Sequence, residues 1–170
     1  MSQLLKVIGA AAIVAGVMVG GCSSKSKDAA KPAATTQAAA NKASLFNRLG
    51  GMNAIKAVVH DFVGRAAADP KVNFTRANMA GVTPWAASPE HVAHLEAMLV
   101  DFICGATGGP CKYTGKDMAT AHKGMKITDE EFGAIAADLK LSLDKFKVPV
   151  PEQTELLAIV GGTRADIVGK

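Results

Sequence analysis

Helical periodicity, interrupted at intervals by glycine and proline, is the feature of this sequence that most constrains its fold. After residue 43, no run alternates apolar and polar residues for long enough to predict a β-sheet. Apolar residues instead recur at helical spacing in four stretches: residues 53–68, the stretch from Ser88 to Gly108, the stretch from Thr128 to Phe146, and a last stretch that contains Leu156 and Ile167. Breaks such as Gly50-Gly51 and Asp69-Pro70 separate them. We therefore predict an all-α domain.

Local start signals support these helices. Ser88-Pro89-Glu90 has the N-cap serine and first-turn proline that are typical of a helix start. Thr128-Asp129-Glu130-Glu131 has the capping-box pattern, in which a threonine and a glutamate cap each other's backbone amides. We also expect a short helix near residues 117–123, which places Met118 and His122 one turn apart on the same side.

The net charge of +4 comes entirely from residues 1–43 and not from the predicted domain after them. Residues 1–43 hold five of the 19 basic side chains and one of the 15 acidic ones, so the 14 of each kind after residue 43 cancel. Nucleic-acid-binding domains carry their own basic excess, and we therefore expect no nucleic-acid partner. Residues 44–170 are long enough for one compact domain and too short for two, and a hydrophobic fraction of 49% argues against extensive disorder there.

The first 21 residues resemble the signal peptide of a bacterial lipoprotein. Lys6 precedes an apolar core, residues 7–19, which at about 13 residues is too short to span a bilayer. The core runs into Val19-Gly20-Gly21-Cys22, where small residues stand directly before a cysteine. The resemblance implies that Cys22 is lipidated and that its acyl chains hold the protein on a membrane. An N-terminal anchor that is not removed is the alternative.

Residues 22–43 predict a disordered tether between this lipid anchor and the domain at residues 44–170. They are rich in Ala, Lys, Ser and Thr and hold no large apolar side chain, so they cannot bury enough surface to fold. Lipoproteins retained in the inner membrane often have an aspartate at the position of Ser23, so in a Gram-negative bacterium the resemblance favours the outer membrane. The expected location is therefore the periplasmic side of the bacterial cell envelope.

Residues 113–125, YTGKDMATAHKGM, carry the most specific motif of the chain. Together with Gly108-Gly109-Pro110 before them and ITDEEF at residues 127–132 after them, they closely resemble the group I truncated haemoglobins. LFNRLGG at residues 45–51, and Asp61-Phe62 a little later, resemble the N-terminal part of the same family. The resemblance covers residues 44–168 and implies a two-over-two helical sandwich around a noncovalent b-type haem. No Cys-x-x-Cys-His occurs, so we expect no covalent c-type attachment.

The resemblance assigns the iron to His122, which matches the proximal ligand of the family. A neutral imidazole is a suitable axial ligand, and an ordinary, partly buried histidine is the alternative. Phe74 is expected to pack flat on the haem or, alternatively, to be plain core. The residues expected to line the haem are Val63, Phe74, Met79, Leu95, Met98, Leu99, Phe102, Met118, Met125, Ile127 and Phe132.

The distal side departs from the family pattern. Many group I proteins have a tyrosine after the Asp-Phe motif and a glutamine on the distal helix, and here Val63 and Leu99 take these positions. A hydrogen-bond donor beside bound dioxygen contributes on the order of 1–3 kcal/mol. Without one, we expect lower dioxygen affinity and easier oxidation to ferric haem, with less effect on carbon monoxide and nitric oxide. The missing donors argue against nitric oxide dioxygenase activity, so whether the chain is an enzyme stays open.

Met98 matches a distal-helix position where some relatives carry a histidine that binds iron as a sixth ligand. A thioether can also ligate haem iron, and His/Met ligation raises the reduction potential. The alternative is that Met98 only packs above the haem.

Other polar and aromatic residues leave alternatives open. His91 and His94, three residues apart, have a spacing that can bind a metal but that exposed helices also show often, and His94 is a candidate partner for a haem propionate. His60 is expected at the surface. Trp85 either covers the distal pocket or packs as a satellite core residue.

Cys104 and Cys111 remain as an even pair once Cys22 is lipidated. In an oxidising compartment their spacing of seven favours a disulfide, which would pin the loop before His122. Two unpaired thiols are the alternative.

Three functions follow from these patterns. The first is a membrane-tethered, haem-binding truncated globin that binds diatomic gases. The second is a six-coordinate haem protein with His122/Met98 ligation, acting in electron transfer or redox sensing with an unknown redox partner. The third is a lipoprotein that keeps the globin fold with little or no haem. The intact His122 counts against the third.

Overall fold

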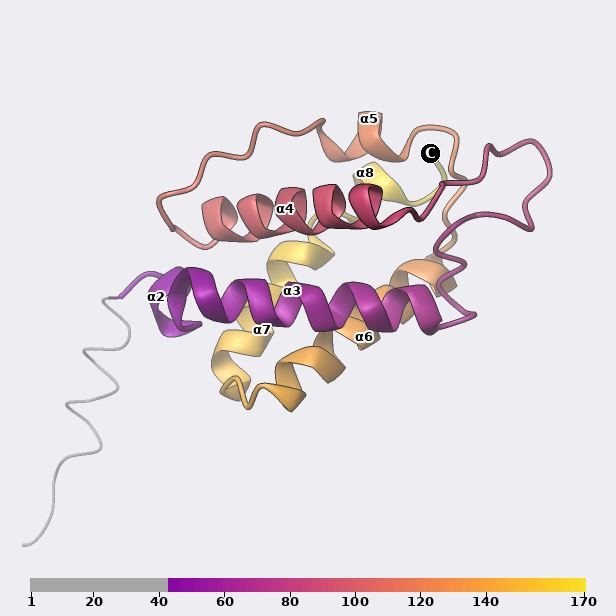
Figure 1. Cartoon of the computed structure of the whole chain (residues 1–170). Helices are drawn as coiled ribbons and strands as arrows, with labels where there is room; N and C mark the ends of the chain where they lie inside the picture. Colours follow the sequence, from indigo (N-terminus) through magenta and orange to yellow (C-terminus); the bar gives the residue numbers. More distant parts are fainter. Residues whose placement is uncertain (1–42) are drawn as a thin grey trace, which may run out of the picture. The chain divides into compact units, whose positions relative to one another are not determined.

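The computed structural model of the chain describes residues 43–170 (Figure 1). The predicted signal peptide, residues 1–21, and all but the last residue of the predicted tether, residues 22–43, lie outside this part. The helices of the described part are α2 (Leu45–Arg48), α3 (Gly51–Ala68), α4 (Pro89–Ala106), α5 (Met118–His122), α6 (Asp129–Lys145), α7 (Val150–Gly161) and α8 (Arg164–Ile167). Between residues 43 and 170 no strand forms, and Ile127 and Val168 make one isolated bridge. The predicted all-α fold is confirmed.

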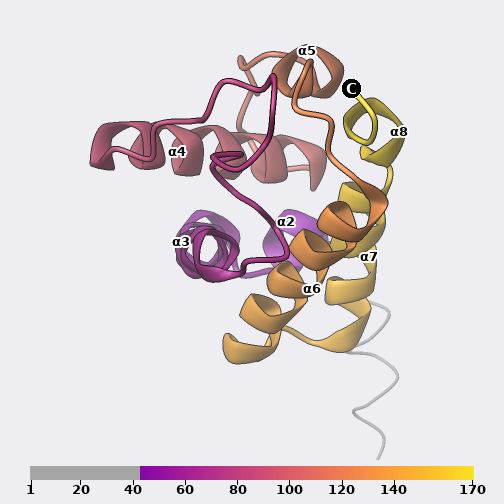
Figure 2. The same ribbon diagram turned by 90° about the vertical axis from the view of Figure 1, so that its right-hand side faces the viewer.

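Two pairs of long helices form the body of the domain. Helix α3 packs against α4 and α6, and α6 packs in turn against α7. Figure 2 shows α3 nearly end-on beneath α4, with α6 and α7 running side by side next to them. The short helix α5 contacts α8 on the far side of α4. This is the two-over-two arrangement that the resemblance to the truncated haemoglobins implies.

Polar caps begin the helices where the sequence predicts them. Ser88 Oγ accepts a hydrogen bond from the His91 amide at 3.3 Å and caps α4. The capping box of α6 is complete, because the Glu131 amide donates to Thr128 Oγ1 and the Thr128 amide donates to Glu131 Oε2. Each cap satisfies backbone amides that a helix start would otherwise leave unpaired.

The structure differs from the sequence prediction at two helix boundaries. Helix α3 begins two residues earlier than predicted, directly after Gly50, whose φ of 96° is a left-handed conformation that suits glycine. The predicted single last helix is two helices, α7 and α8, because the chain turns at Gly162 and Thr163. There the Thr163 hydroxyl donates to the Val160 carbonyl at 2.7 Å, which gives the turn a local partner.

One hydrophobic core holds the two pairs together. Its most buried members come from α3, α4, α6 and α7 and include Val59, Ile103, Leu139, Leu143 and Leu156, each with an exposed fraction of 5% or less. The described helices include none that is both long and apolar enough to cross a bilayer.

A disulfide joins Cys104, near the end of α4, to Cys111 in the loop before α5, with 5.6 Å between the Cα atoms. Cys104 is fully buried. Gly109 lies inside the closed loop, and a Cβ atom there would fall 2.7 Å from Cys104 Sγ and 2.8 Å from the Cys104 carbonyl oxygen. The close approach of these two segments therefore requires glycine at this position.

Candidate functional site

A cavity of about 300 Å³ opens between α3, α4, α5 and α6. Its volume lies at the lower end of the range typical of small-molecule sites, which is about 300–1,000 Å³. The lining is mostly aliphatic and aromatic: Phe62, Val63, Val72, Phe74, Trp85, Leu95, Leu99, Phe102, Ile103, Met118, Met125, Ile127, Phe132, Ile135, Leu139, Val160 and Ile167. Its polar members are Asn73, Arg76, Thr83, His122, Glu131 and Thr163. The cavity is therefore an apolar chamber with few polar groups.

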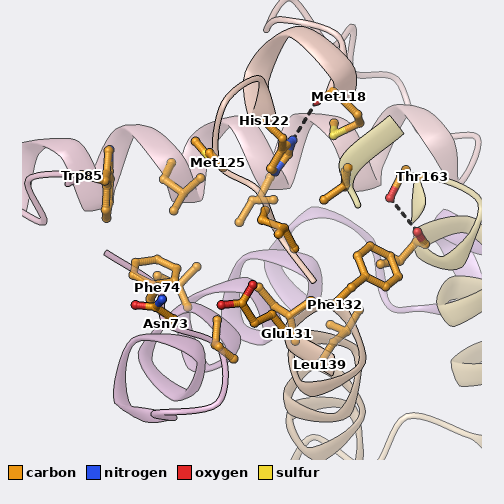
Figure 3. A pocket seen from close by; sticks show the side chains of 18 of the residues that line it. Asn73, Phe74, Trp85, Met118, His122, Met125, Glu131, Phe132, Leu139 and Thr163 are labelled. Carbon is orange, nitrogen blue, oxygen red and sulfur yellow. Dashed lines mark hydrogen bonds between the residues drawn. The ribbon is translucent and has the colours of Figure 1, made fainter. Parts of the chain in front are cut away.

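The structure brings together most of the residues that the sequence assigns to the haem. Figure 3 shows His122 reaching from α5 into the cavity, with Phe74 and Trp85 at one end and Phe132 at the other. The predicted residues that line the cavity are Val63, Phe74, Leu95, Leu99, Phe102, Met118, His122, Met125, Ile127 and Phe132.

Two of the residues that the sequence assigns to the haem, Met98 and Met79, are not among those that line the cavity. On α4, Leu95, Leu99 and Phe102 form the stripe that faces the cavity. Met98 lies three residues after Leu95 and four before Phe102 on the same helix, and its side chain is half-buried without lining the cavity. Met79 lies in a series of turns, where its amide donates to the Arg76 carbonyl and its carbonyl accepts from Val82.

His122 is held so that one of its ring nitrogens is free for a ligand. Its Nδ1 atom lies 2.8 Å from the carbonyl oxygen of Met118, one turn earlier on α5. Because a carbonyl oxygen only accepts, Nδ1 must carry the hydrogen. In the neutral imidazole the lone pair is then on Nε2. The hydrogen bond that fixes the tautomer comes from the backbone, as is usual for metal-ligating histidines.

Helix α5 owes its start to Asp117, whose Oδ1 accepts from the Thr120 amide at 2.9 Å. Hydrogen bonds from Thr120 hold the pKa of Asp117 below its ordinary value, so the cap is ionised at neutral pH. This cap fixes the single turn that joins Met118 to His122, and it therefore supports the imidazole geometry.

The residues expected on the distal side form a hydrocarbon surface. Val63 on α3 is 3% exposed, and Leu95 and Leu99 line the cavity from α4. None of the three side chains carries a hydrogen-bond donor. The substitutions that the sequence shows at the usual donor positions therefore face the cavity.

Phe74 and Trp85 close one end of the cavity. Their ring centroids are 5.3 Å apart with an interplanar angle of 85°, which is an edge-to-face contact. The backbone amide of Trp85 donates to the Thr75 carbonyl at 2.8 Å, which ties two parts of the loop between α3 and α4 together. Trp85 packs on Phe74 and also lines the cavity, so packing and covering the cavity are compatible roles for this residue.

Sequence reasoning missed Arg76 and did not place Glu131 in the site. Glu131 gave a capping-box signal and nothing more, and Arg76 lies in an irregular loop without periodicity. Arg76 is 4% exposed, and its Nη1 atom donates to Glu131 Oε1 at 2.7 Å. Burial raises the pKa of Glu131, but hydrogen bonds from the Thr128 amide and Arg76 hold it below its ordinary value. The pair is therefore ionised, and its charges are balanced inside the cavity wall.

The remaining histidines lie outside the cavity lining. His60 is exposed and pairs with Glu96 at 3.0 Å, as expected for a surface residue. His91 is exposed, and its Nδ1 donates to the Ala86 carbonyl at 2.7 Å. His94 is exposed and does not reach the cavity. Within residues 43–170, no cluster of three or more His, Cys, Asp or Glu side chains has the arrangement of a metal site.

The residues of the cavity fit the haem that the sequence leads us to expect. Haem needs an apolar chamber and an axial donor, and the chamber provides one imidazole whose Nε2 lone pair has no hydrogen-bond partner in the described part of the chain. Polar groups are few, and the charged ones are paired with each other. The donor set, a single imidazole in an apolar wall, suits iron in haem better than a free metal ion.

Comparison with known proteins agrees with this geometry. The family model described as bacterial-like globin matches residues 44–168. A group 1 truncated hemoglobin from Tetrahymena pyriformis is 32% identical over 126 residues, which cover 74% of this chain and 95% of that protein. A group 1 truncated hemoglobin from Mycolicibacterium paratuberculosis is 32% identical over 130 residues, or 75% of this chain and 86% of that protein.

Solved structures show the same fold. The crystal structure of the Tetrahymena pyriformis truncated hemoglobin in the Fe(III) form has a TM-score of 0.65 and 31% identity, covering 75% of this chain and all of that chain. The 2/2 hemoglobin from Synechococcus, solved in the cyanomet state with covalently attached heme, has a TM-score of 0.62 and 30% identity over the same shares.

Proposed function

The chain belongs to the bacterial-like globin family, and from this we propose that it binds haem b noncovalently in the cavity, with His122 as the axial ligand, and that it takes up a diatomic gas there. The observation that carries the proposal is the geometry of the His122 imidazole in the apolar cavity. Its Nδ1 donates a hydrogen bond to the Met118 carbonyl, so the lone pair of Nε2 remains available to a ligand. Noncovalent binding is supported by the lining, which holds no cysteine and no histidine other than His122.

The haem, when bound, supplies an iron atom that binds a gas molecule. The chain's own residues set which gas is favoured. Val63 and Leu99 line the site with hydrocarbon and offer no hydrogen-bond donor to a bound ligand. Because dioxygen depends on such a donor more than carbon monoxide or nitric oxide do, we propose that the site discriminates against dioxygen relative to these two gases. We do not propose nitric oxide dioxygenase activity, which needs stable dioxygen binding.

The test is the absorption spectrum of the full-length chain after titration with haem, in the ferric and ferrous states, with and without carbon monoxide. We expect one haem per chain and a five-coordinate ferrous spectrum that changes promptly when carbon monoxide is added. H122G should lose this spectrum and regain it when free imidazole is added, because imidazole then replaces the missing ligand. H94A is the matched control and should behave as the wild type, because His94 lies outside the cavity. A chain that retains no stoichiometric haem would contradict the proposal.

The alternative with His122/Met98 ligation finds no support in the position of Met98, which lies outside the cavity lining. We therefore expect M98A to leave the ferrous spectrum unchanged, while L99A, which alters a lining residue, should change ligand-binding rates. A six-coordinate, low-spin ferrous spectrum that M98A converts to a five-coordinate one would favour the electron-transfer function instead.

We further propose that the globin is attached to the periplasmic side of a bacterial membrane, with the outer membrane favoured, through lipidated Cys22. The support is the sequence alone: an apolar core followed by Val19-Gly20-Gly21-Cys22, with Ser23 after the cysteine. The test is fractionation after expression in a Gram-negative host, combined with mass spectrometry of the N-terminal peptide. We expect an acylated Cys22 in the membrane fraction and no acylation in C22S. An unmodified Cys22 in the wild type would contradict the proposal.

A further inference from the structure

Arg76 combines three features that are costly for an arginine. Its side chain is 5% exposed, its backbone has a φ of 58°, and its Nε atom is buried without a hydrogen-bond partner in the described structure. A left-handed conformation is unfavourable for a residue with a side chain, and burying a guanidinium costs more unless it is paired. Such costs persist where the surrounding contacts fix the residue in place.

The contacts of Arg76 converge on the segment that follows His122. Nη2 donates to the Met125 carbonyl at 2.6 Å and to the Lys126 carbonyl at 3.2 Å. These two carbonyls lie three and four residues after His122 along the chain. Nη1 donates to Glu131 on α6. One planar guanidinium therefore spans the end of the α5 segment and the start of α6.

The carboxylate of Glu131 binds both Arg76 and the backbone at the start of α6. Its Oε2 accepts from the Thr128 amide at 2.8 Å and completes the cap of α6, while its Oε1 accepts from Arg76 at 2.7 Å. The carboxylate is mostly buried, with 15% of its side chain exposed. Arg76 is therefore bound to the start of α6, whose capping box is formed by Thr128 and Glu131 without any residue of the Arg76 loop.

The segment between α5 and α6 has little regular structure of its own. Gly124 and Lys126 both have left-handed backbones, with φ of 80° and 53°. Met125 and Ile127 from this segment line the cavity. The backbone also pairs with the C-terminus, where the Lys126 amide donates to the Lys170 carbonyl at 2.7 Å. Arg76 supplies the side-chain hydrogen bonds that reach the carbonyls of Met125 and Lys126.

We propose that Arg76 is a positioning residue for His122. By binding the Met125 and Lys126 carbonyls and anchoring them to Glu131, it fixes the end of α5 and thus the direction of the His122 Nε2 atom. Arg76 lies in the same loop as Phe74 and Trp85. It therefore also connects the cavity wall formed by these two residues to the segment that follows His122. The inference rests on the proposed function, because its effect is read at haem iron bound by His122.

Arg48 provides a matched control. It is an arginine with 13% of its side chain exposed, it binds Glu152 and Glu155, and its Nε atom is also buried without a partner. It lies outside the lining of the cavity. R48M and R76M therefore each remove a mostly buried guanidinium that is paired with glutamate, but only Arg76 lines the cavity and binds the segment after His122.

The experiment compares the haem-loaded full-length wild type, R48M and R76M. The first readout is the stretching frequency of the bond between His122 and ferrous iron, measured by resonance Raman spectroscopy. The second is the rate of haem transfer to an excess of an apoglobin acceptor. We expect both variants to lose stability. Only R76M should shift and broaden the stretching band and release haem about 10–100-fold faster, because mutating a residue that orients a metal ligand typically weakens metal binding by such a factor. R76K, which keeps the charge but binds fewer groups at once, should lie between R76M and the wild type.

R76K also keeps the test decisive if R76M does not fold. A wild-type stretching band and release rate in R76K, and also in R76M where that variant folds, would overturn the positioning role and leave the proposed function intact. Failure of the wild type and R48M to bind haem would overturn the proposed function, and the positioning role with it.

Discussion

The rings of Phe74 and Trp85 meet edge to face, with 5.3 Å between their centroids, at one end of the apolar cavity. Such a pair contributes about 0.5–1.5 kcal/mol beyond the burial of its area. Both residues come from the loop between α3 and α4, which contains no helix (Figure 1). The aromatic contact is therefore a tertiary restraint on a segment that local structure leaves irregular.

Trp85→Ala should open this end of the cavity. Removal of the indole leaves Phe74 without its partner and gives gas molecules a wider path, so we expect faster carbon monoxide association with the haem-loaded chain. Flash photolysis measures this rate. Phe146→Ala is the control, because Phe146 is 41% exposed and lies outside the cavity. An unchanged association rate in the Trp85 variant would show that Trp85 only packs.

Val63→Tyr should restore a hydrogen-bond donor to the cavity. We expect dioxygen to dissociate about tenfold more slowly, since one hydrogen bond is worth about 1–1.5 kcal/mol, and ferric haem to form more slowly in air. Stopped-flow kinetics measures both. Val63→Phe adds the same ring without the hydroxyl group, so it separates the donor from the effect of volume. Equal dissociation rates in the two variants would refute a role for the donor.

Asp61→Asn should destabilise the domain at neutral pH. Hydrogen bonds from Lys145, Arg65 and Ser142 hold the pKa of Asp61 well below its ordinary value, so the folded state binds fewer protons here than the unfolded chain. This contribution is fully present above the unfolded-state pKa of about 4 and is lost progressively as the pH falls from there through the lower pKa of the folded state. We expect a loss of about 1–3 kcal/mol at pH 7.

Urea unfolding of the Asp61 variant at pH 7 and pH 3 measures both the loss and its pH dependence. Asp129→Asn is the control, because Asp129 pairs with Arg164 at an exposed site, where an ion pair contributes little. A stability difference for Asp61→Asn that stays the same at both pH values would contradict the assignment to charge.

Asp138→Asn should stabilise the domain at neutral pH. Asp138 is 7% exposed and its Oδ2 atom has no hydrogen-bond partner in the described structure. Burial, together with the charge of Asp69, raises the pKa of Asp138, so its ionisation in the folded state costs stability as the pH rises through that pKa. The neutral amide removes this cost, by about 1 kcal/mol. Thermal unfolding across a pH series should show the advantage shrinking toward acid, with the exposed Asp166→Asn variant unchanged throughout.

Replacing Cys104 and Cys111 together by alanine should lower the free energy of unfolding by roughly 2 kcal/mol, the value expected for a short closed loop. The loop leads to Tyr113, whose ring packs edge-on against Phe102 in the cavity wall, 5.6 Å between centroids. We therefore also expect faster haem release. Chemical unfolding with and without a dithiol reductant checks the first effect: the reductant should lower the stability of the wild type and leave the variant unchanged.

The sequence by itself determined the parts of this protein that depend on near neighbours. The capping box at Thr128 and Glu131 predicted the start of α6, and the four-residue spacing of Met118 and His122 predicted that they share one side of a short helix. Both signals act within one helical turn, where backbone hydrogen bonds and side-chain direction follow directly from spacing. The assignment of His122 as the candidate ligand came instead from the resemblance of the surrounding motif to the group I truncated haemoglobins, because local spacing alone does not distinguish a ligand from an ordinary histidine.

Only the tertiary structure decided which side chains meet inside the cavity. Met98 has helical spacing to both Leu95 and Phe102, yet these two line the cavity and Met98 does not. Arg76 lies in an irregular loop and has a left-handed backbone, which no local pattern predicts. Its side chain binds Glu131, which lies 55 residues further along the chain. Contacts of this kind depend on how whole helices are packed, because a side chain in an irregular loop takes its direction from the elements that it happens to lie against.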